Sequence, residues 1–575
     1  MSDSTSFLPS PPPAPPTAPV APTASAPIPV ALGVQLDPVD APAPRSPNVP
    51  AAAVEGEPTV TVTIDGQSVT VRQGTNVLEA AKLAGRDICH FCYHPGLSIA
   101  ASCRQCLVEL ELRGRPVGKL QPSCQIQVES EMVVHTESPA VLKARREMLE
   151  FTLKNHPIDC PICDKAGECT LQRHYMAHDH AYSRIDVAKI RKPKAKDLGR
   201  EILLDAERCI LCSRCVRFCE ELPGTSELVM VHRGDREQID VAEDLPLDNA
   251  YSLNVVDICP VGALTSKDFR FQIRPWELRT TETTCPGCAT GCAVELHTKH
   301  ERAYRVVPRF DPTVNGHWMC DEGRYTYKTT DPAARVLTAR VGEETVPLAQ
   351  AITAVAQALR GKKVAVVFSA AATNEANAAM AQLADLLEAE RFVLGRPDGE
   401  GDALLRDADK NPNTRGAYRA ASLAAKHEGE LALALAGRAF QAAVLLDAEA
   451  ELSDFALHGL GEIFSVALTD RQTTLSRACR VVLPTTSWAE TLGTFVNRQG
   501  RLRLLRPAWR PPGERTHAAE LIGRLVAALG GPSLGTAREQ VLAFVESWGD
   551  TALLDALRHA APAPPTLLRF GNSRG

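Results

Sequence analysis

Cysteines are the side chains of this 575-residue chain best suited to chemistry, and seventeen of the eighteen lie between Cys89 and Cys320. They fall into groups that each offer four soft ligands, three close together and one farther away. The groups are Cys92, Cys103, Cys106 and Cys124; His156, Cys160, Cys163 and Cys169; Cys209, Cys212, Cys215 and Cys259; and Cys285, Cys288, Cys292 and Cys320. Such spacing is typical of chains that wrap iron–sulfur clusters.

Disulfides and zinc are the alternative uses of clustered cysteines. Disulfides need an oxidising compartment, but the N-terminus has neither the basic region nor the compact apolar region of a signal peptide. A lone CxxC pair would suit zinc as well as an iron–sulfur cluster. Zinc is disfavoured here because the sites are tight triplets with a remote fourth ligand and not two CxxC pairs in tandem. The run CILCSRC, closed by Cys259-Pro260, is close to the bacterial ferredoxin pattern. We therefore expect four iron–sulfur sites, and hence electron transfer.

The second group needs a histidine. Its loop supplies only Cys160, Cys163 and Cys169, and a [4Fe–4S] cluster takes four ligands, so His156 is predicted to be the fourth. The alternative is a surface or capping histidine. A neutral imidazole in place of a thiolate removes one negative charge, which raises the reduction potential of the site.

Three cysteines are left over and are predicted not to bind iron. Cys89 lies three residues before Cys92 and only mimics a CxxC motif. Cys219 is one residue late for the second cluster of a ferredoxin, so we interpret it as a buried structural thiol. Cys479 is isolated before an apolar strand and should pack as a small hydrophobic residue.

Local patterns predict the elements that position the first ligands. Order begins near Pro58, where VTVTIDGQSVTV alternates and Asp65-Gly66 indicates a hairpin. Thr75 is predicted to cap a helix over NVLEAAKLA, which Gly85 terminates. With a strand at CLVELEL, these elements predict a small ferredoxin-like domain that binds a [2Fe–2S] cluster.

Further along the chain, a helix is predicted from Ser138 to Asn155, with Ser138 as its cap and Pro157 after its end. MVHRGDREQI is predicted to be a hairpin. Beyond about residue 335, apolar strands such as KKVAVVFSA and AAVLLDA alternate with alanine-rich helical stretches, which predicts parallel βαβ units. No G-x-G-x-x-G or P-loop pattern appears, so no nucleotide site is indicated.

Composition narrows the functional classes. A net charge of −6 gives no reason to expect nucleic-acid binding. No apolar stretch approaches the roughly 20 residues of a membrane-spanning helix, so membrane association should come through a partner. Fifteen of the 42 prolines lie in the first 50 residues, which predicts a disordered Pro/Ala-rich tail over residues 1–57.

Together these motifs resemble a known family. The segments FCYHPGLSIAASCRQCLVE, HPIDCPICDKAGECTLQ, RCILCSRCVRFCEE, DICPVGALTSK and NGHWMCDEGRY closely resemble the family of G subunits, the iron–sulfur subunits of bacterial NADH-quinone oxidoreductase, respiratory complex I. The resemblance is strong over residues 58 to about 335. It continues weakly through VLPTTSWAETLGTFVNRQGR, which looks like the remnant of a molybdopterin oxidoreductase domain. The proline-rich extension and the short C-terminal domain depart from the family pattern.

The resemblance implies a multidomain α+β and α/β fold. The expected domains are a tail (1–57), a β-grasp [2Fe–2S] ferredoxin-like domain (58–137), a [4Fe–4S] module with one histidine and three cysteine ligands (138–198), a [4Fe–4S] ferredoxin-like module (199–277), a [4Fe–4S] module (278–334) and a degenerate molybdopterin-oxidoreductase-like α/β domain (335–575). The Cys92 group would hold the [2Fe–2S] cluster and the other groups three [4Fe–4S] clusters. No FMN, NAD or molybdopterin is expected on this chain.

The function implied by the resemblance is electron relay. Electrons would come from an FMN-containing, NADH-oxidising subunit and pass toward quinone through further iron–sulfur subunits, with proton translocation coupled in the whole complex. The chain would lie peripherally on the cytoplasmic side of the bacterial inner membrane, without a complete active site of its own.

The alternative is a subunit of an NAD-linked molybdenum formate dehydrogenase, which shares the four motifs. It would need a larger cofactor domain and a metal ligand, and Cys479 is the only cysteine downstream. An iron-only hydrogenase is disfavoured because no clustered cysteines follow Cys320. A scaffold with dead sites is disfavoured because every ligand position is filled.

Overall fold

The computed structural model describes residues 48, 52, 56–179, 182–242, 245–422, 425–446, 450 and 452–559. The predicted tail lies almost entirely outside the described residues. Within the described ranges no helix is long and apolar enough to cross a membrane.

The first sheet presents the loops of the Cys92 group. Its strand order is β2-β1-β6-β3-β4, with β5 paired to β3, and β1 runs parallel to β6 while the other pairs are antiparallel. The predicted hairpin is confirmed: Asp65 (φ 46°) and Gly66 (φ 82°) both adopt the left-handed conformation of a two-residue turn. The strands are β1 (Thr59–Ile64), β2 (Gln67–Arg72), β3 (Leu107–Leu112), β4 (Arg115–Pro116), β5 (Gln121–Pro122) and β6 (Met132–His135).

The helix of this domain, α1 (Val77–Leu83), is capped by Asn76, so the prediction of Thr75 was wrong. The Asn76 side chain accepts a hydrogen bond from the Glu79 N–H at 2.9 Å. The Thr75 carbonyl is occupied by the N–H of Val128 at 2.8 Å, so the intrahelical bonds begin at the next residue. Both residue types are good caps, and only this pairing across the fold decides between them.

The second helix, α2 (Pro139–Leu153), confirms its prediction. The Ser138 hydroxyl accepts from the Val141 N–H, and proline occupies the first turn. The helix ends three residues before His156. The chain then forms the short 3-10 turn η1 (Cys160–Ile162) and α3 (Thr170–His178), which together hold the cysteine loop of this group.

The Cys209 group is carried by a small antiparallel sheet of order β11-β8-β7, two short helices and a hairpin. The predicted hairpin at residues 230–239 is confirmed as β9 paired antiparallel to β10. The elements are β7 (Lys196–Asp197), β8 (Ile202–Leu204), α4 (Arg214–Glu221), β9 (Leu228–Val231), β10 (Gln238–Val241), α5 (Asn254–Ile258) and β11 (Leu264–Ser266).

A three-stranded antiparallel sheet, in the order β12-β13-β14, follows and carries the Cys285 group. Cys285 comes directly after β12, and Cys292 directly before β13. The elements here are η2 (Pro275–Glu277), β12 (Arg279–Thr284), β13 (Ala293–Lys299), β14 (Arg302–Pro308), α6 (Asp321–Arg324), η3 (Tyr325–Thr330) and η4 (Pro332–Ala334).

The C-terminal part is a seven-stranded sheet in the order β16-β15-β21-β20-β19-β17-β18. The strands from β17 to β21 pair parallel, which confirms the predicted βαβ units, and β15 and β16 pair antiparallel at one edge. The strands are β15 (Ala339–Val341), β16 (Glu344–Val346), β17 (Val364–Ser369), β18 (Glu390–Leu394), β19 (Ala442–Leu446), β20 (Phe464–Thr469) and β21 (Val481–Pro484).

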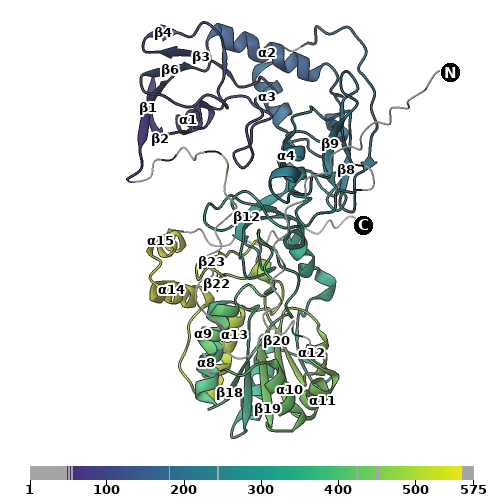
Figure 1. The fold of residues 1–575 in the computed structure, drawn as a ribbon. Helices are drawn as coiled ribbons and strands as arrows, with labels where there is room; N and C mark the ends of the chain where they lie inside the picture. The colour runs from purple at the N-terminus through teal and green to yellow at the C-terminus, as the bar shows by residue number, and fades with distance from the viewer. Residues whose placement is uncertain are drawn as a thin grey trace, which may run out of the picture. The chain divides into compact units, whose positions relative to one another are not determined.

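Helices cover both faces of this sheet. Figure 1 shows α8, α9 and α13 on one side of the strands and α10, α11 and α12 on the other. The remaining elements are α7 (Leu348–Leu359), α8 (Asn374–Leu386), α9 (Thr414–Ala421), α10 (Glu428–Ala436), α11 (Asp454–Glu462), α12 (Thr474–Ala478), η5 (Trp488–Glu490), β22 (Gly493–Val496), β23 (Leu502–Leu505), α13 (Ala518–Leu529), α14 (Ala537–Trp548) and α15 (Thr551–His559).

Candidate iron–sulfur sites

All eighteen cysteines are described, and all are free thiols. Within the described part of the chain, no three His, Cys, Asp or Glu side chains are grouped as ligands of a single metal ion. The predicted ligands instead surround small cavities or lie within reach of one another, as follows for each group.

The thiols of the Cys92 group are connected by hydrogen bonds. Cys92 receives hydrogen bonds from Cys103 and Cys124, which hold the pKa of Cys92 well below its usual value. A hydrogen bond from Cys124 is also the main cause that lowers the pKa of Cys106 to about 7. The structure therefore brings all four predicted ligands of this group together, although Cys124 comes from a different loop.

The Cys209 group surrounds a cavity of about 20 Å³, which all four predicted ligands line. Leu211 (φ 54°) and Ser213 (φ 59°) are left-handed and alternate with the cysteines. This alternation turns backbone N–H groups inward and makes a concave site for an anion. The Leu211 N–H donates to Cys209 Sγ at 3.4 Å.

The Cys285 group surrounds a similar cavity of about 10 Å³, again lined by all four predicted ligands. The Gly287 N–H donates to Cys285 Sγ at 3.4 Å, and the Gly323 N–H donates to Cys320 Sγ at 3.3 Å. Burial raises the pKa of Cys285 to about 12. The thiol would therefore stay protonated unless a bound cation stabilised its thiolate.

The His156 group lies at a larger cavity of about 440 Å³. His156, Cys160 and Cys169 line it. Cys163 does not, but it lies close enough to Cys160 and Cys169 for their charges to interact. A Cβ atom at Gly262 would lie 2.2 Å from Cys163 Sγ, so only glycine fits there.

Burial lowers the pKa of His156 to about 4, so its imidazole is neutral at physiological pH, as a metal ligand must be. Its Nδ1 is buried without a hydrogen-bond partner among the described residues. Gln105, between two predicted ligands of the Cys92 group, is fully buried, and both of its amide atoms also lack partners among the described residues. Buried polar atoms are rarely left unpaired, so both residues fit sites that hold a further group.

The three left-over cysteines do not line these cavities. Cys219 and Cys89 are fully buried, and Cys479 packs in the apolar core beneath the C-terminal sheet. Burial raises the pKa of Cys89 and of Cys479 to about 12. Cys219 and Cys479 are thus buried thiols, as predicted.

Several arginines beside these sites were missed in the sequence, among them Arg208 and Arg214. Arg208 is buried beside Asp159, to which its guanidinium donates at 2.7 and 3.1 Å, and so ties the Cys209 loop to the loop of the His156 group. Arg214 donates to Ile258 O at 3.0 Å and to Tyr93 O, each next to a predicted ligand of a different group. The only sequence signal was the position of each arginine directly beside a cysteine.

Family models match the same four regions. They describe a 2Fe-2S iron–sulfur cluster binding domain (residues 57–139), the NADH-ubiquinone oxidoreductase-G iron–sulfur binding region (145–184), the ferredoxin-like domain of NADH-quinone oxidoreductase subunit 3 (199–265) and the molybdopterin oxidoreductase Fe4S4 domain (278–332). The matches and the fold define a multidomain iron–sulfur protein with [2Fe–2S] and [4Fe–4S] domains of ferredoxin type.

Curated relatives narrow this class. The chain is 40% identical over 290 residues to the NADH-quinone oxidoreductase G subunit of Streptomyces coelicolor, which covers 50% of this chain and 34% of that protein. It is 38% identical over 353 residues to the mitochondrial 78 kDa subunit of NADH-ubiquinone oxidoreductase of Neurospora crassa, covering 59% of this chain and 46% of that protein. The predicted resemblance to the G subunits of NADH-quinone oxidoreductase is confirmed, and the chain spans less than half the length of these relatives.

Among solved structures, a chain of an NAD+-reducing [NiFe]-hydrogenase is 32% identical. That match covers 37% of this chain and 90% of the other, with a TM-score of 0.33.

Proposed function

We propose that this chain relays electrons through iron–sulfur clusters within an NADH-quinone oxidoreductase, between an NADH-oxidising, FMN-containing subunit and the quinone-side iron–sulfur subunits. A cluster bound by each group would accept and release one electron at a time. The observation that carries the proposal is the direct contact between neighbouring groups. Arg214 joins the Cys209 group to the Cys92 group, and the N–H of Thr170, beside the ligand Cys169, donates to the carbonyl oxygen of Pro260, which follows the ligand Cys259.

We also propose which residues bind each cluster. We assign one [2Fe–2S] cluster to the Cys92 group, where the β-grasp arrangement of sheet and α1 supports it. Three [4Fe–4S] clusters are assigned to the His156, Cys209 and Cys285 groups. The chain's own residues bury the thiols, donate N–H groups to their sulfurs and supply nearby arginines, and these features tune a cluster's potential. The domain divisions at residues 137, 198, 277 and 334 follow from the same assignment.

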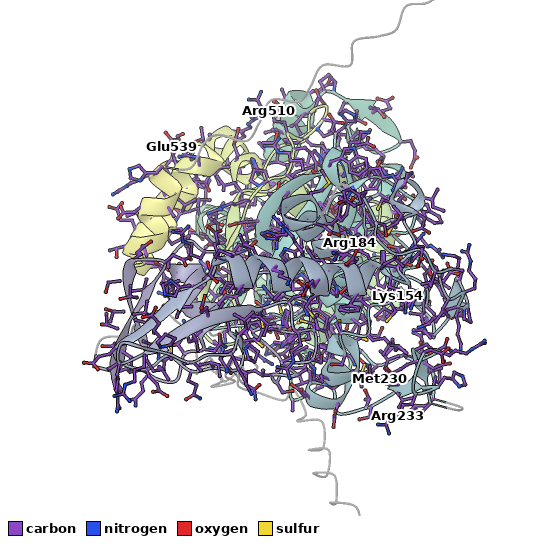
Figure 2. All side chains as sticks on the ribbon, turned by 90° about the horizontal axis from the view of Figure 1, so that it is seen from above. Lys154, Arg184, Met230, Arg233, Arg510 and Glu539 are labelled. Carbon is purple, nitrogen blue, oxygen red and sulfur yellow. The ribbon has the colours of Figure 1, made fainter. Side chains whose placement is uncertain are left out.

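We also propose a partner surface beside the His156 group, where an electron would leave the chain. Apolar side chains around the cavity are exposed, among them Ile158 (68%), Met176 (77%) and Tyr182 (71%). Lys154, just after the end of α2, also lines this cavity. Arg184, labelled beside the same helix in Figure 2, is paired with Glu150 of that helix. Exposed apolar patches of this kind mark interaction sites. We propose that the next iron–sulfur subunit docks here, on the cytoplasmic side of the membrane.

The proposal is tested on the purified chain after anaerobic reconstitution with iron and sulfide. We expect about fourteen irons per chain, two in one cluster and twelve in three. EPR on the reduced chain should resolve both cluster types. NADH should reduce the clusters only after the FMN-containing partner is added. Reduction by NADH without that partner, or a chain without clusters after reconstitution, would contradict the proposal.

The formate dehydrogenase alternative is tested by the molybdenum content. A cavity lies at the carboxyl ends of the parallel strands, beside Thr373 and Arg471, where open α/β sheets bind ligands. Its volume of about 90 Å³ is well below the roughly 300–1,000 Å³ typical of ligand pockets. No cysteine is among the residues that line it. The geometry therefore favours the relay, and molybdenum in the purified chain would favour the alternative.

A further inference from the structure

Arg214 is a buried cation between two groups of predicted ligands. It is the first residue of α4, it directly precedes the ligand Cys215, and its side chain is 8% exposed. One guanidinium nitrogen donates to Ile258 O, which precedes the ligand Cys259. The other donates to Tyr93 O, which follows the ligand Cys92. Arg214 is 121 residues from Tyr93 and 44 residues from Ile258 in the chain, so a single guanidinium connects distant loops.

No carboxylate of the described residues neutralises this charge. Arg214 forms no ion pair among them, and its Nε is buried without a hydrogen-bond partner. The acidic groups that act on it most strongly are thiols from both sites, Cys212 and Cys259 on one side and Cys92 and Cys103 on the other. A buried arginine without a counter-ion is strongly unfavourable, so a negative charge is expected beside it.

Most of the other buried arginines among the described residues have carboxylate partners. Arg208 is paired with Asp159, and Arg515 with Glu490. Arg145 is also buried without an ion pair among the described residues, but it donates to Thr136 O, and Thr136 adjoins no predicted ligand in the chain. Among these arginines, Arg214 alone contacts backbone beside predicted ligands of two different groups.

We propose that Arg214 is the shared counter-ion of the Cys92 and Cys209 clusters and raises the reduction potential of both. The proposal rests on the proposed function, since it requires clusters at both groups. Each cluster with its thiolates carries negative charge, and reduction adds one electron without forming or breaking a bond. The nearby cation stabilises the reduced form of either cluster, and an electron that moves between them remains near the same positive charge.

The test compares three variants of the full, reconstituted chain in EPR-monitored redox titrations. Arg214→Met removes the charge at similar length, and Arg214→Lys keeps the charge but loses the two-pronged hydrogen bonding. Arg145→Met removes a buried arginine elsewhere. We expect Arg214→Met to lower the equilibrium constant for reduction of each of the two clusters about tenfold. For a one-electron couple, this is a drop of about 59 mV in the reduction potential. Arg214→Lys and Arg145→Met should leave both potentials near those of the unmodified chain.

Several results would overturn the proposal. These are a shift at only one cluster, no shift at either, equal shifts in the Met and Lys variants, or a similar shift in Arg145→Met. If the Arg214→Met chain does not assemble both clusters, the iron contents of the Met and Lys variants are compared instead. Loss of both clusters with Met but not with Lys supports the need for the charge, whereas equal loss with Met and Lys refutes it. An unmodified chain without clusters at the Cys92 and Cys209 groups would instead contradict the proposed function.

Discussion

The thiol of Cys169 donates a hydrogen bond to the carbonyl oxygen of Pro260, across 3.6 Å. The same oxygen accepts from the Thr170 N–H at 2.9 Å. Pro260 follows the predicted ligand Cys259, so the backbone of one predicted site directly supports the loop of another. Because interiors are close-packed, a change in either loop should be transmitted to its neighbour.

Replacement of His156 by alanine should remove one [4Fe–4S] cluster, because the loop of this group otherwise offers only three thiols. The His156→Cys variant should keep the cluster but make it harder to reduce, since a thiolate adds one negative charge. EPR and iron analysis of the reduced chain measure both outcomes. An unchanged spectrum and full iron content in the alanine variant would show that His156 is not a ligand.

The cysteines outside the four groups should be dispensable for iron binding. A chain with Cys89, Cys219 and Cys479 all replaced by alanine should keep about fourteen irons, by the stoichiometry of the four clusters. A matched Cys212→Ala variant should lose the iron of one cluster. If any single change among the first three removed the iron of a whole cluster, our ligand sets would have to be revised.

Gly262→Ala should disrupt the His156 group. The added methyl would lie 2.2 Å from Cys163 Sγ, which is impossible without a shift of the loop. We expect a loss of about four irons, those of one [4Fe–4S] cluster. Gly461→Ala is the control, because the nearest atom to its methyl would be Ala478 O at 3.9 Å. Full iron content in the Gly262 variant would mean that the loop adapts without losing the cluster.

Glu490 should be essential for the stability of the C-terminal domain. It is fully buried and accepts from Arg335 at 2.9 Å, from Trp509 Nε1 at 2.7 Å and from Arg515. Glu490→Ala leaves two buried arginines without their partner and should cost about 3–5 kcal/mol. Urea unfolding measures the loss. The fully exposed Glu343 is the control, and equal unfolding midpoints for the two alanine variants would refute the prediction.

His174 should make the chain less stable in mild acid. Burial lowers the pKa of His174 to about 4, from an ordinary value near 6.5 in the unfolded chain. The unfolded state therefore binds more protons between these values, so the contribution of His174 is complete above pH 6.5 and is lost as the pH falls to 4. The measurement is the urea unfolding midpoint at about pH 7.5 and at about pH 4.5, which together cover most of this range. The difference between the two midpoints should be smaller in His174→Gln than in the unmodified chain. If the variant and the unmodified chain show the same difference in midpoint, His174 does not cause the loss of stability in acid.

Much of the fold could be predicted from local patterns. The hairpin at Asp65-Gly66 and the helix that follows Ser138 depend on backbone preferences within a few residues, so the sequence alone predicts them. The N-cap of α1 cannot be predicted from local patterns, because the choice between Thr75 and Asn76 depends on a hydrogen bond from Val128, far along the chain.

The sequence by itself determined the class of site, because three predicted ligands of each group lie close together in the chain and their types are those of iron–sulfur proteins. The tertiary structure alone decided which groups are neighbours. The contacts of Arg214 with Tyr93 and of Cys169 with Pro260 join loops that are 121 and 91 residues apart. Such contacts arise from packing between elements, and no local spacing encodes them.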